Sequence, residues 1–336
     1  MANITLNKKY FFNNLDIIAK QSKGADKIAL VLKDNAYGHG IIEIAKMASE
    51  YGITKAVVNN NNEAKKIENY FEYILVLADI PNIYNNKIRY TINDLKSITK
   101  FPELTRVELK VDTGMHRNGI AMCELKDAME LIKKQKLILE AVFTHHRSAD
   151  ELSSEWFWQN ENFKNIKSKS KELGLEFGFE NLRFHSANSA SLFRYQDFSE
   201  DMARVGIAVY GCLESIEKDY GLKPILSLYA DRISSREMKK GEFIGYGATY
   251  KIKKNCVVSN YNFGYGDGFL RICSNNFSTV KDKELVGRIS MDNSSYISDD
   301  EQLHIFNDAR VVSKYAKTIS YEVLTSLKSD LKREII

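Results

Sequence analysis

Lys33 closes a short apolar run, and its type and position could do chemistry. The run reads IALVL over residues 28–32, and the lysine is followed by DNAYGHG, with glycines at 38 and 40. Such a lysine is either a solvated loop residue or an amine at the mouth of a pocket. In a partly desolvated pocket, burial disfavours the ammonium form, so the amine becomes a nucleophile toward an aldehyde near neutral pH. Residues elsewhere in the chain decide between these two interpretations.

Several later apolar runs also end in residues that bind anions or move protons. The segments KVDTGMHRNG (110–119), THHRSAD (144–150), HSANSAS (185–191) and ARVGIAVYG (203–211) supply Lys110, Arg117, His145, Asn188, Ser189 and Arg204. Any one of these residues could instead be a loop cap or an ion pair that lines a barrel. Their shared position at the ends of the runs favours a common site.

The apolar runs alternate with stretches of helical periodicity from residue 27 to about residue 211. Two such stretches are IIEIAKMASEYG (41–52) and CELKDAMELIKKQK (123–136). Strands that alternate with helices pair in parallel, and eight repeats close into a (β/α)₈ barrel of the TIM type, whose active site lies at the carboxyl ends of the strands. The eight expected strands span residues 27–32, 55–59, 73–78, 88–92, 106–112, 139–145, 182–187 and 203–211.

After about residue 222 the pattern changes to short β-type runs separated by Gly, Asn and Asp. Helix-period stretches nearly vanish until the tail, which favours a mostly-β second domain. We therefore expect an α/β chain with a barrel over residues 1–221 and a β domain over 222–336. The first residues of the chain could pair with the β domain. No linker rich in Pro or Ser marks the junction, so the two domains should pack closely.

The overall composition is that of an ordinary globular protein. The 336 residues are 44% hydrophobic and 27% charged, and the net charge of +4 is a small difference between 48 basic and 44 acidic residues. We therefore expect no nucleic-acid partner, and no apolar stretch is long enough to predict a membrane span. The four cysteines are scattered without a metal-ligand pattern. This predicts no metal centre and a reducing compartment, the cytoplasm.

Read in order, eight segments resemble the alanine racemase family along essentially the whole chain. They are VLKDNAYGHG, KVDTGMHRNG, FTHHRSAD, HSANSAS, ARVGIAVYG, GYGATY, GYGDG and GRISMDN. The resemblance implies a pyridoxal phosphate enzyme with an N-terminal barrel and a C-terminal β domain. It also implies a head-to-tail homodimer with shared active sites, and interconversion of L- and D-alanine that supplies D-alanine for cell-wall peptidoglycan.

The resemblance also implies how the cofactor is held. Lys33 would form a covalent imine with the pyridoxal aldehyde, and Arg204 would face the pyridine nitrogen. Because an arginine does not readily give up a proton, the ring nitrogen should stay unprotonated and the cofactor should be a weaker electron sink. That would favour simple proton removal and return over other reactions. The phosphate and the rest of the cofactor would be held by Tyr37, Asn188, Ser189, Gly206 and Ile207.

Racemisation needs acid and base groups on both faces of the substrate Cα. By resemblance, Lys33 is one base, and Tyr246 of GYGATY, supplied across the dimer interface, is the other. His145 would hydrogen-bond Tyr246 and connect it to Arg204. Arg117 would contact the cofactor and the substrate carboxylate, and Lys110, often carbamylated in the family, would orient it. The substrate-binding residues Met291 and Asp292 would come from the partner subunit, and Tyr265 would line the entry corridor.

The tail departs from the family pattern. TSLKSDLKREII (325–336) lacks the terminal Val-Pro-Arg pattern, and Ser329 stands where some members place another phosphate-contacting tyrosine. VLADIP (76–81) stands where a glycine-rich variant is familiar. These departures concern the phosphate site and the substrate entrance rather than the two bases.

Three alternative functions remain open at this point. One is a racemase of broader or different specificity, for serine or a basic amino acid, because few residues can shift a side-chain pocket. A decarboxylase on the same type of barrel is disfavoured by GYGATY and Arg204. The third is a non-catalytic pyridoxal phosphate-binding protein. The complete second domain counts against it, because such chains stop near the barrel.

Overall fold

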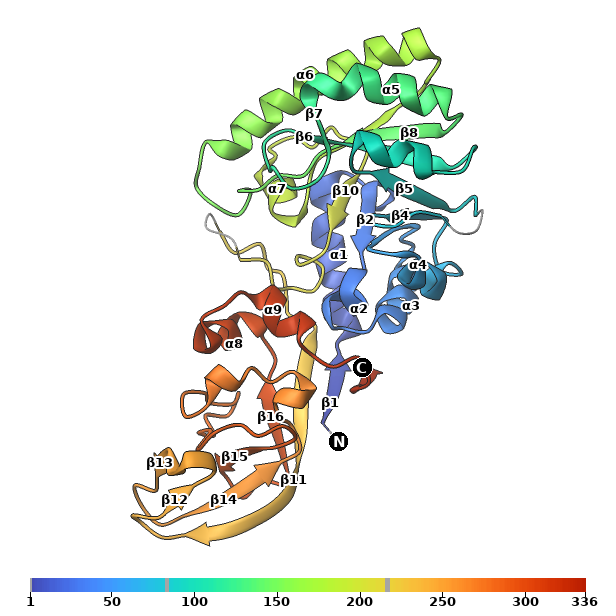
Figure 1. Cartoon of the computed structure of the whole chain (residues 1–336). Coiled ribbons are helices and arrows are strands. Elements are labelled where there is room, and N and C mark those ends of the chain that lie inside the picture. Colours follow the sequence, from blue (N-terminus) through green and yellow to red (C-terminus); the bar gives the residue numbers. More distant parts are fainter. Residues whose placement is uncertain (1, 82–84, 215–217) are drawn as a thin grey trace.

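The first part of the chain folds into a nearly closed parallel barrel, as the sequence predicts (Figure 1). The computed structural model describes residues 2–81, 85–214 and 218–336. Within these residues, eight parallel strands follow one another in the order β10-β2-β3-β4-β5-β6-β8-β9. The strands are β2 (Ile28–Val31), β3 (Lys55–Val58), β4 (Tyr73–Val76), β5 (Ile88–Ile92), β6 (Arg106–Asp112), β8 (Ile138–Phe143), β9 (Arg183–His185) and β10 (Ala203–Val205), and the short β7 (Ile120–Ala121) pairs with β6.

The longer helices cover the outside of the barrel because each has one buried face, whereas the short α2 lies at the cavity. In α5 the buried residues are Leu125, Ala128, Met129 and Ile132, which follow the helical repeat. The strands lack such alternation, and β2 is buried at all four positions, as expected for a parallel strand covered on both sides. The helices are α1 (Lys8–Ser22), α2 (Lys33–Tyr37), α3 (Ile41–Tyr51), α4 (Asn61–Ile67), α5 (Leu125–Lys134), α6 (Glu155–Phe177) and α7 (Ser189–Arg194), with 3₁₀ turns at Ala25–Lys27, Leu95–Lys100 and Met122–Glu124.

The last barrel strand is shorter than the sequence predicts. We expected one strand over 203–211, but β10 ends at Val205 and the chain then turns. The N–H of Val209 donates to the carbonyl of Gly206, which closes this turn at 2.9 Å. Hydrogen bonds from Arg204 N to Ala187 O (2.9 Å) and from Asp201 N to Phe184 O (3.2 Å) join the β10 and β9 segments, so they bridge the seam of the barrel.

The second part of the chain forms a separate domain rich in strands (Figure 1). Its main sheet has the order β15-β14-β11-β1-β17, with β16 also paired to β11. The elements are β11 (Leu226–Met238), β12 (Phe243–Ile244), β13 (Tyr250–Lys251), β14 (Cys256–Tyr261), β15 (Ser294–Ile297), β16 (Gln302–Phe306), α8 (Ala309–Ala316), α9 (Ser320–Thr325) and β17 (Lys332–Ile335), with 3₁₀ turns at Tyr246–Ala248, Tyr265–Asp267 and Arg271–Cys273.

The N-terminal strand β1 (Asn3–Leu6) belongs to this second sheet. It pairs antiparallel with β11 and parallel with β17, so both ends of the chain meet in one sheet. The pairing of β1 with β17 places α9 and β17 beside the barrel segment that follows β2, where Gly38 lies against the backbone of Leu324. We keep the division between residues 221 and 222 as a proposal, with β1 counted in the second domain.

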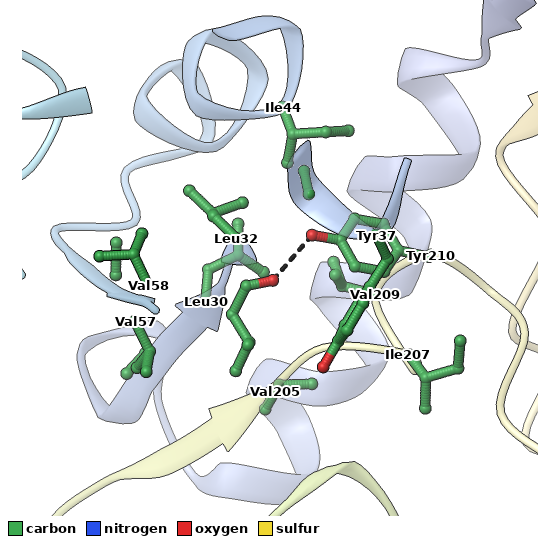
Figure 2. Packing of buried hydrophobic residues seen from close by; sticks show 14 of the residues in the cluster. Leu30, Leu32, Tyr37, Ile44, Val57, Val58, Val205, Ile207, Val209 and Tyr210 are labelled. Carbon is green, nitrogen blue, oxygen red and sulfur yellow. Dashed lines mark hydrogen bonds between the residues drawn. The ribbon is translucent and has the colours of Figure 1, made fainter. Parts of the chain in front are cut away.

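The strand that precedes Lys33, β2, is held by a dense apolar core (Figure 2). Leu30 and Leu32 pack among side chains of β3, β10 and α3, and none of them is exposed to solvent. The hydroxyl of buried Tyr210 donates to the carbonyl of Val31 at 2.8 Å. Because interiors are packed this closely, the end of β2 has a fixed position from which a side chain can project.

Neither a membrane-spanning helix nor a metal-binding cluster occurs in the part of the chain that the structure describes. Between residues 2–81, 85–214 and 218–336 there is no helix long and apolar enough to cross a membrane. The same residues contain no group of three or more His, Cys, Asp or Glu side chains placed to hold a metal ion.

Candidate active site

A cavity of about 460 Å³ opens at the carboxyl ends of the barrel strands. It brings together residues that lie more than 170 positions apart in the sequence, as the barrel prediction requires. Ten of the predicted site residues line it: Lys33, Tyr37, Lys110, Arg117, His145, Asn188, Ser189, Arg204, Gly206 and Ile207. Leu77, from the segment 76–81 that departs from the family pattern, also lines it.

Lys33 stands at the edge of this cavity, directly after the buried strand. Its Nζ lies 3.2 Å from Oδ2 of Asp34 and remains partly accessible. The next four residues, Asp34 to Tyr37, have φ values between 49° and 54°, a left-handed turn made without glycine. Each such residue costs roughly 1–2 kcal/mol, so the surrounding structure must hold this turn in place.

Several hydrogen bonds hold the left-handed turn. One carboxylate oxygen of Glu63 accepts from the N–H of Asp34 at 2.7 Å, and the other accepts from Asn59 N at 2.8 Å. Burial lowers the pKa of His39 to about 4, so its ring is neutral and Nδ1 can donate to the carbonyls of Ala36 and Tyr37 at 3.1 and 3.0 Å. The turn therefore presents Lys33 and Tyr37 to the cavity together.

Arg333 joins the C-terminal strand β17 to the same turn. Its Nε and Nη2 donate to the carbonyl of Gly38 at 3.1 and 2.8 Å. The final segment of the chain thus contacts the lysine-bearing loop directly, although its sequence departs from the Val-Pro-Arg pattern.

The part of the cavity wall that follows β10, the strand next to β2, forms a cradle suited to an anion. A Cβ added to Gly206 would lie 2.4 Å from Cε2 of Tyr37, so only glycine allows this close approach. The Oγ of Ser189 accepts from the N–H groups of Gly206 and Ala208 at 3.0 and 3.3 Å, which leaves its hydroxyl proton free to donate. Asn188 caps α7 by accepting from Ser191 N at 2.9 Å.

Arg204 is buried in the cavity wall and is held by acceptors on several sides. It donates to the carbonyls of Thr144 (2.7 Å) and Ser186 (3.2 Å), and Nη1 contacts Nδ1 of His185. Its Nη2 lies 3.5 Å from Nδ1 of His145. Burial lowers the pKa of Arg204 to about 10, so the guanidinium stays charged at neutral pH.

The cations around Arg204 also affect Lys110 and His145. Burial, with Arg204 and Arg117 nearby, lowers the pKa of Lys110 from 10.5 to about 8. Burial and the same two arginines, together with Lys110, hold the pKa of His145 well below its usual value. At neutral pH His145 is therefore an uncharged imidazole in a positively charged wall that suits phosphate and carboxylate groups.

Tyr321 is a cavity residue that the sequence did not reveal. It lies on α9, lines the cavity, and its ring meets that of Tyr37 edge to face at 5.7 Å. Ser329, which we placed at a position of phosphate contact, is exposed and does not line the cavity, so that assignment is wrong. Because the tail lacks the family's terminal pattern, the sequence offers no marker that locates this tyrosine. A tyrosine within a polar helix carries no local signal of a binding role.

The four remaining predicted residues do not line this cavity. Tyr246, Tyr265, Met291 and Asp292 lie in the C-terminal domain, and the strands β12 and β13 that flank Tyr246 are at its far end from the barrel (Figure 1). Tyr246 is 68% exposed and Met291 57%. The N–H of Gly266 donates to the carbonyl of Met291 at 2.7 Å, so the Tyr265 and Met291 segments are neighbours.

The cavity has the components that a pyridoxal phosphate site needs. Lys33 offers a primary amine, Ser189 and the close approach of Tyr37 to Gly206 form an anion cradle, and Arg204 is a fixed donor in the same cavity wall. The chain's own residues therefore fit this cofactor.

Comparison with known proteins supports the same assignment. The family model for the alanine racemase N-terminal domain matches residues 6–214, and that for the C-terminal domain matches residues 225–335. The chain is 44% identical over 335 residues to an alanine racemase of Nitratiruptor, covering 99% of each chain.

Solved structures have the same fold. An alanine racemase of Bacillus anthracis with bound L-Ala-P is 27% identical with a TM-score of 0.86, covering 100% of this chain and 95% of that one. An alanine racemase of Bartonella henselae with covalently bound pyridoxal phosphate has a TM-score of 0.83 at 24% identity, covering 100% and 99%. The predicted barrel with a C-terminal β domain is confirmed.

Proposed function

Because this chain belongs to the alanine racemase family, we propose that it interconverts L- and D-alanine with pyridoxal phosphate as its cofactor. The observation that carries the proposal is the position of Lys33, an accessible amine at the rim of a cavity lined by an anion cradle and a buried arginine. We further propose a cytoplasmic location, which the four unpaired cysteines fit, and a role in supplying D-alanine to the cell wall.

The cradle would bind the cofactor phosphate, and Lys33 would bind its aldehyde carbon. Ser189 would donate its hydroxyl proton, the backbone at Gly206 and Ile207 would approach closely, and the phenols of Tyr37 and Tyr321 would reach the phosphate from the other side. When bound, pyridoxal phosphate withdraws electrons from the substrate Cα–H bond and acidifies it. Arg204 would donate toward the ring nitrogen without protonating it.

Two groups of the protein would then move the Cα proton. Lys33 Nζ, freed when the substrate amine takes its place, would remove or return the proton on one face of Cα. The Tyr246 phenol of a second copy would act on the opposite face. Arg117 would bind the substrate carboxylate, and neutral His145 would link the phenol to Arg204 by hydrogen bonds.

The second copy is part of the proposal because Tyr246 cannot serve its own cavity in the arrangement described here. The exposed side chains of Tyr246, Tyr265 and Met291 give the C-terminal domain an apolar surface that a partner's barrel could cover. We therefore propose a homodimer in which each cavity is completed by Tyr265, Met291, Asp292 and Tyr246 of the other copy.

A mixing experiment tests this shared site. Lys33→Ala and Tyr246→Phe variants are each expected to be nearly inactive. Mixed after denaturation and refolding together, they should form heterodimers with one intact site out of two, which restores about a quarter of the wild-type activity. A mixture that stays inactive, while a wild-type sample treated alike recovers, would argue that both residues act within one chain.

A racemase for basic amino acids is the second candidate, because Asp150 and Glu214 also line the cavity. Either carboxylate could pair with a substrate side-chain ammonium. Offering the twenty amino acids in deuterated water and measuring deuterium at Cα decides between the candidates. We expect alanine to exchange fastest, whereas faster exchange of lysine or arginine would favour the second candidate.

A further inference from the structure

A buried carboxylate, that of Glu108, is linked to Arg204 through one intervening side chain, His185. The proposed mechanism does not use it. Glu108 on β6 is completely buried and accepts three hydrogen bonds. Its Oε1 accepts from the Tyr73 hydroxyl at 2.6 Å and from Arg183 Nη2 at 2.9 Å. Its Oε2 lies 2.8 Å from Nε2 of His185, the same imidazole whose Nδ1 contacts Arg204.

The charge of Glu108 decides where the proton of His185 resides. Burial alone would raise the pKa of Glu108, but His185, Arg183 and Tyr73 outweigh it and bring this pKa down to about 2. An ionised carboxylate can only accept, so Nε2 of His185 must carry the proton that faces it. Burial also lowers the pKa of His185, so the ring is neutral and Nδ1 is left as an acceptor.

Arg204 needs an acceptor at this position because a guanidinium can only donate. Its other partners around the buried end are the carbonyls of Thr144, His185 and Ser186. An imidazole with its proton on Nδ1 would instead point a donor at Nη1, and the contact would become repulsive. The position of Arg204 in the cavity wall therefore depends on which nitrogen of His185 is protonated.

We propose that Glu108 is a positioning residue for Arg204, acting through His185 by fixing the Nε2–H tautomer. The linked groups run from Arg183 on β9 through Glu108 on β6 and His185 on β9 to Arg204 on β10. A buried negative charge thus supports the arginine without placing a carboxylate beside the cofactor nitrogen. The consequence for catalysis rests on the proposed racemase function, whereas the tautomer of His185 does not.

Glu108→Gln reverses the polarity of this chain with little change in shape. Arg183 can only donate, so the amide oxygen should stay on its side, and the amide NH₂ would then face Nε2 of His185. Nε2 must become the acceptor, and the proton moves to Nδ1, where it opposes Arg204. The matched control is Tyr73→Phe, which removes a donor to the other carboxylate oxygen and leaves the His185 contact in place.

Nitrogen-15 NMR of the histidines in the full-length protein tests the tautomer directly, with the His185 signal assigned from a His185→Gln variant. We expect the wild type and Tyr73→Phe to carry the proton on Nε2, and Glu108→Gln to carry it on Nδ1. A wild type protonated on Nδ1 or on both nitrogens at neutral pH would overturn the proposal, even if Glu108→Gln does not fold. An unchanged tautomer in Glu108→Gln would also overturn it.

Kinetics provide the second readout. Glu108→Gln should lower kcat for alanine racemisation about 10–100-fold with a smaller change in KM. Losses of this size are typical when a residue that orients a functional side chain is removed. Tyr73→Phe should stay within about threefold of wild type. Equal losses in both variants would overturn the positioning role. An inactive wild type with the Nε2–H tautomer would refute the proposed function while supporting the Glu108–His185 link.

Discussion

The charge on Lys110 should destabilise the protein in a manner that depends on pH. Burial beside Arg204 and Arg117 lowers the pKa of Lys110 from 10.5 to about 8. Between these values the unfolded chain holds a proton that the folded chain has lost, so raising the pH stabilises the fold. Below pH 8 the full penalty is about 3 kcal/mol, because each unit of difference corresponds to about 1.4 kcal/mol.

Lys110→Met removes the charge while keeping a side chain of similar length. The variant should be more stable than wild type near neutral pH, and its advantage should shrink by about 2 kcal/mol between about pH 8 and pH 9.5. Urea unfolding, followed by tryptophan fluorescence in buffers free of CO₂, measures the free energy of unfolding at each pH. A difference in unfolding free energy between the two proteins that stays constant over this range would show that folding does not lower the pKa of Lys110.

The same lysine should react with CO₂ because its neutral amine is populated near pH 8. The neutral Nζ would attack the carbon of CO₂ and lose a proton, which forms a carbamate of charge −1. Starting from the ammonium form, two protons are released to solvent and the charge changes from +1 to −1. That charge would sit beside Arg117 and Arg204 and stabilise them. Adding bicarbonate at pH 8 should therefore stabilise the wild type and leave Lys110→Met unchanged, and a carbamate signal should appear with carbon-13-labelled bicarbonate. Equal responses of the two proteins would contradict carbamylation.

Three further predictions concern the cavity and the proposed second base. Gly206→Ala puts a Cβ 2.4 Å from Tyr37 Cε2, so the tyrosine ring must move by about 1 Å. If this overpacking costs the cofactor-bound state roughly 1–3 kcal/mol, a titration should show pyridoxal phosphate binding that is weaker by about fivefold or more. Unchanged binding would contradict the cradle. Tyr321→Phe should weaken cofactor binding, whereas Tyr10→Phe, at the same exposure of 38%, should not; equal affinities would remove Tyr321 from the phosphate site. Tyr246→Phe should slow Cα hydrogen exchange more from L-alanine than from D-alanine, and equal slowing would argue against this assignment of the two bases to the faces of Cα.

The sequence predicted the barrel and much of its rim because these features are local. The run before Lys33 reveals both a strand and its end, Lys110 lies near the end of a later such run, and a parallel barrel gathers such ends on one rim. The register of the eight runs then brings their polar ends into one cavity.

Features that depend on tertiary contacts could not be predicted. Tyr321 reaches the cavity only because β17 pairs with β1 and α9 packs beside Gly38. The left-handed turn at Asp34 to Tyr37 contains no glycine, and although Asp34 and Asn35 tolerate a positive φ, residue type does not predict four such residues in a row. Glu108 lies within a buried strand that carries other charged residues, so its role is visible only once Arg183 and His185 are in place.

If Lys33 is the amine that binds the cofactor, chemical trapping should attach the cofactor to this one residue. Borohydride reduction of the protein loaded with pyridoxal phosphate makes the covalent link permanent, and peptide mass spectrometry locates it. The control is Lys65→Ala, at an exposed lysine on α4 outside the cavity. We predict one phosphopyridoxyl group on Lys33, retained in Lys65→Ala and absent in Lys33→Ala. Labelling of another lysine in the wild type, or no labelling at all, would contradict the account.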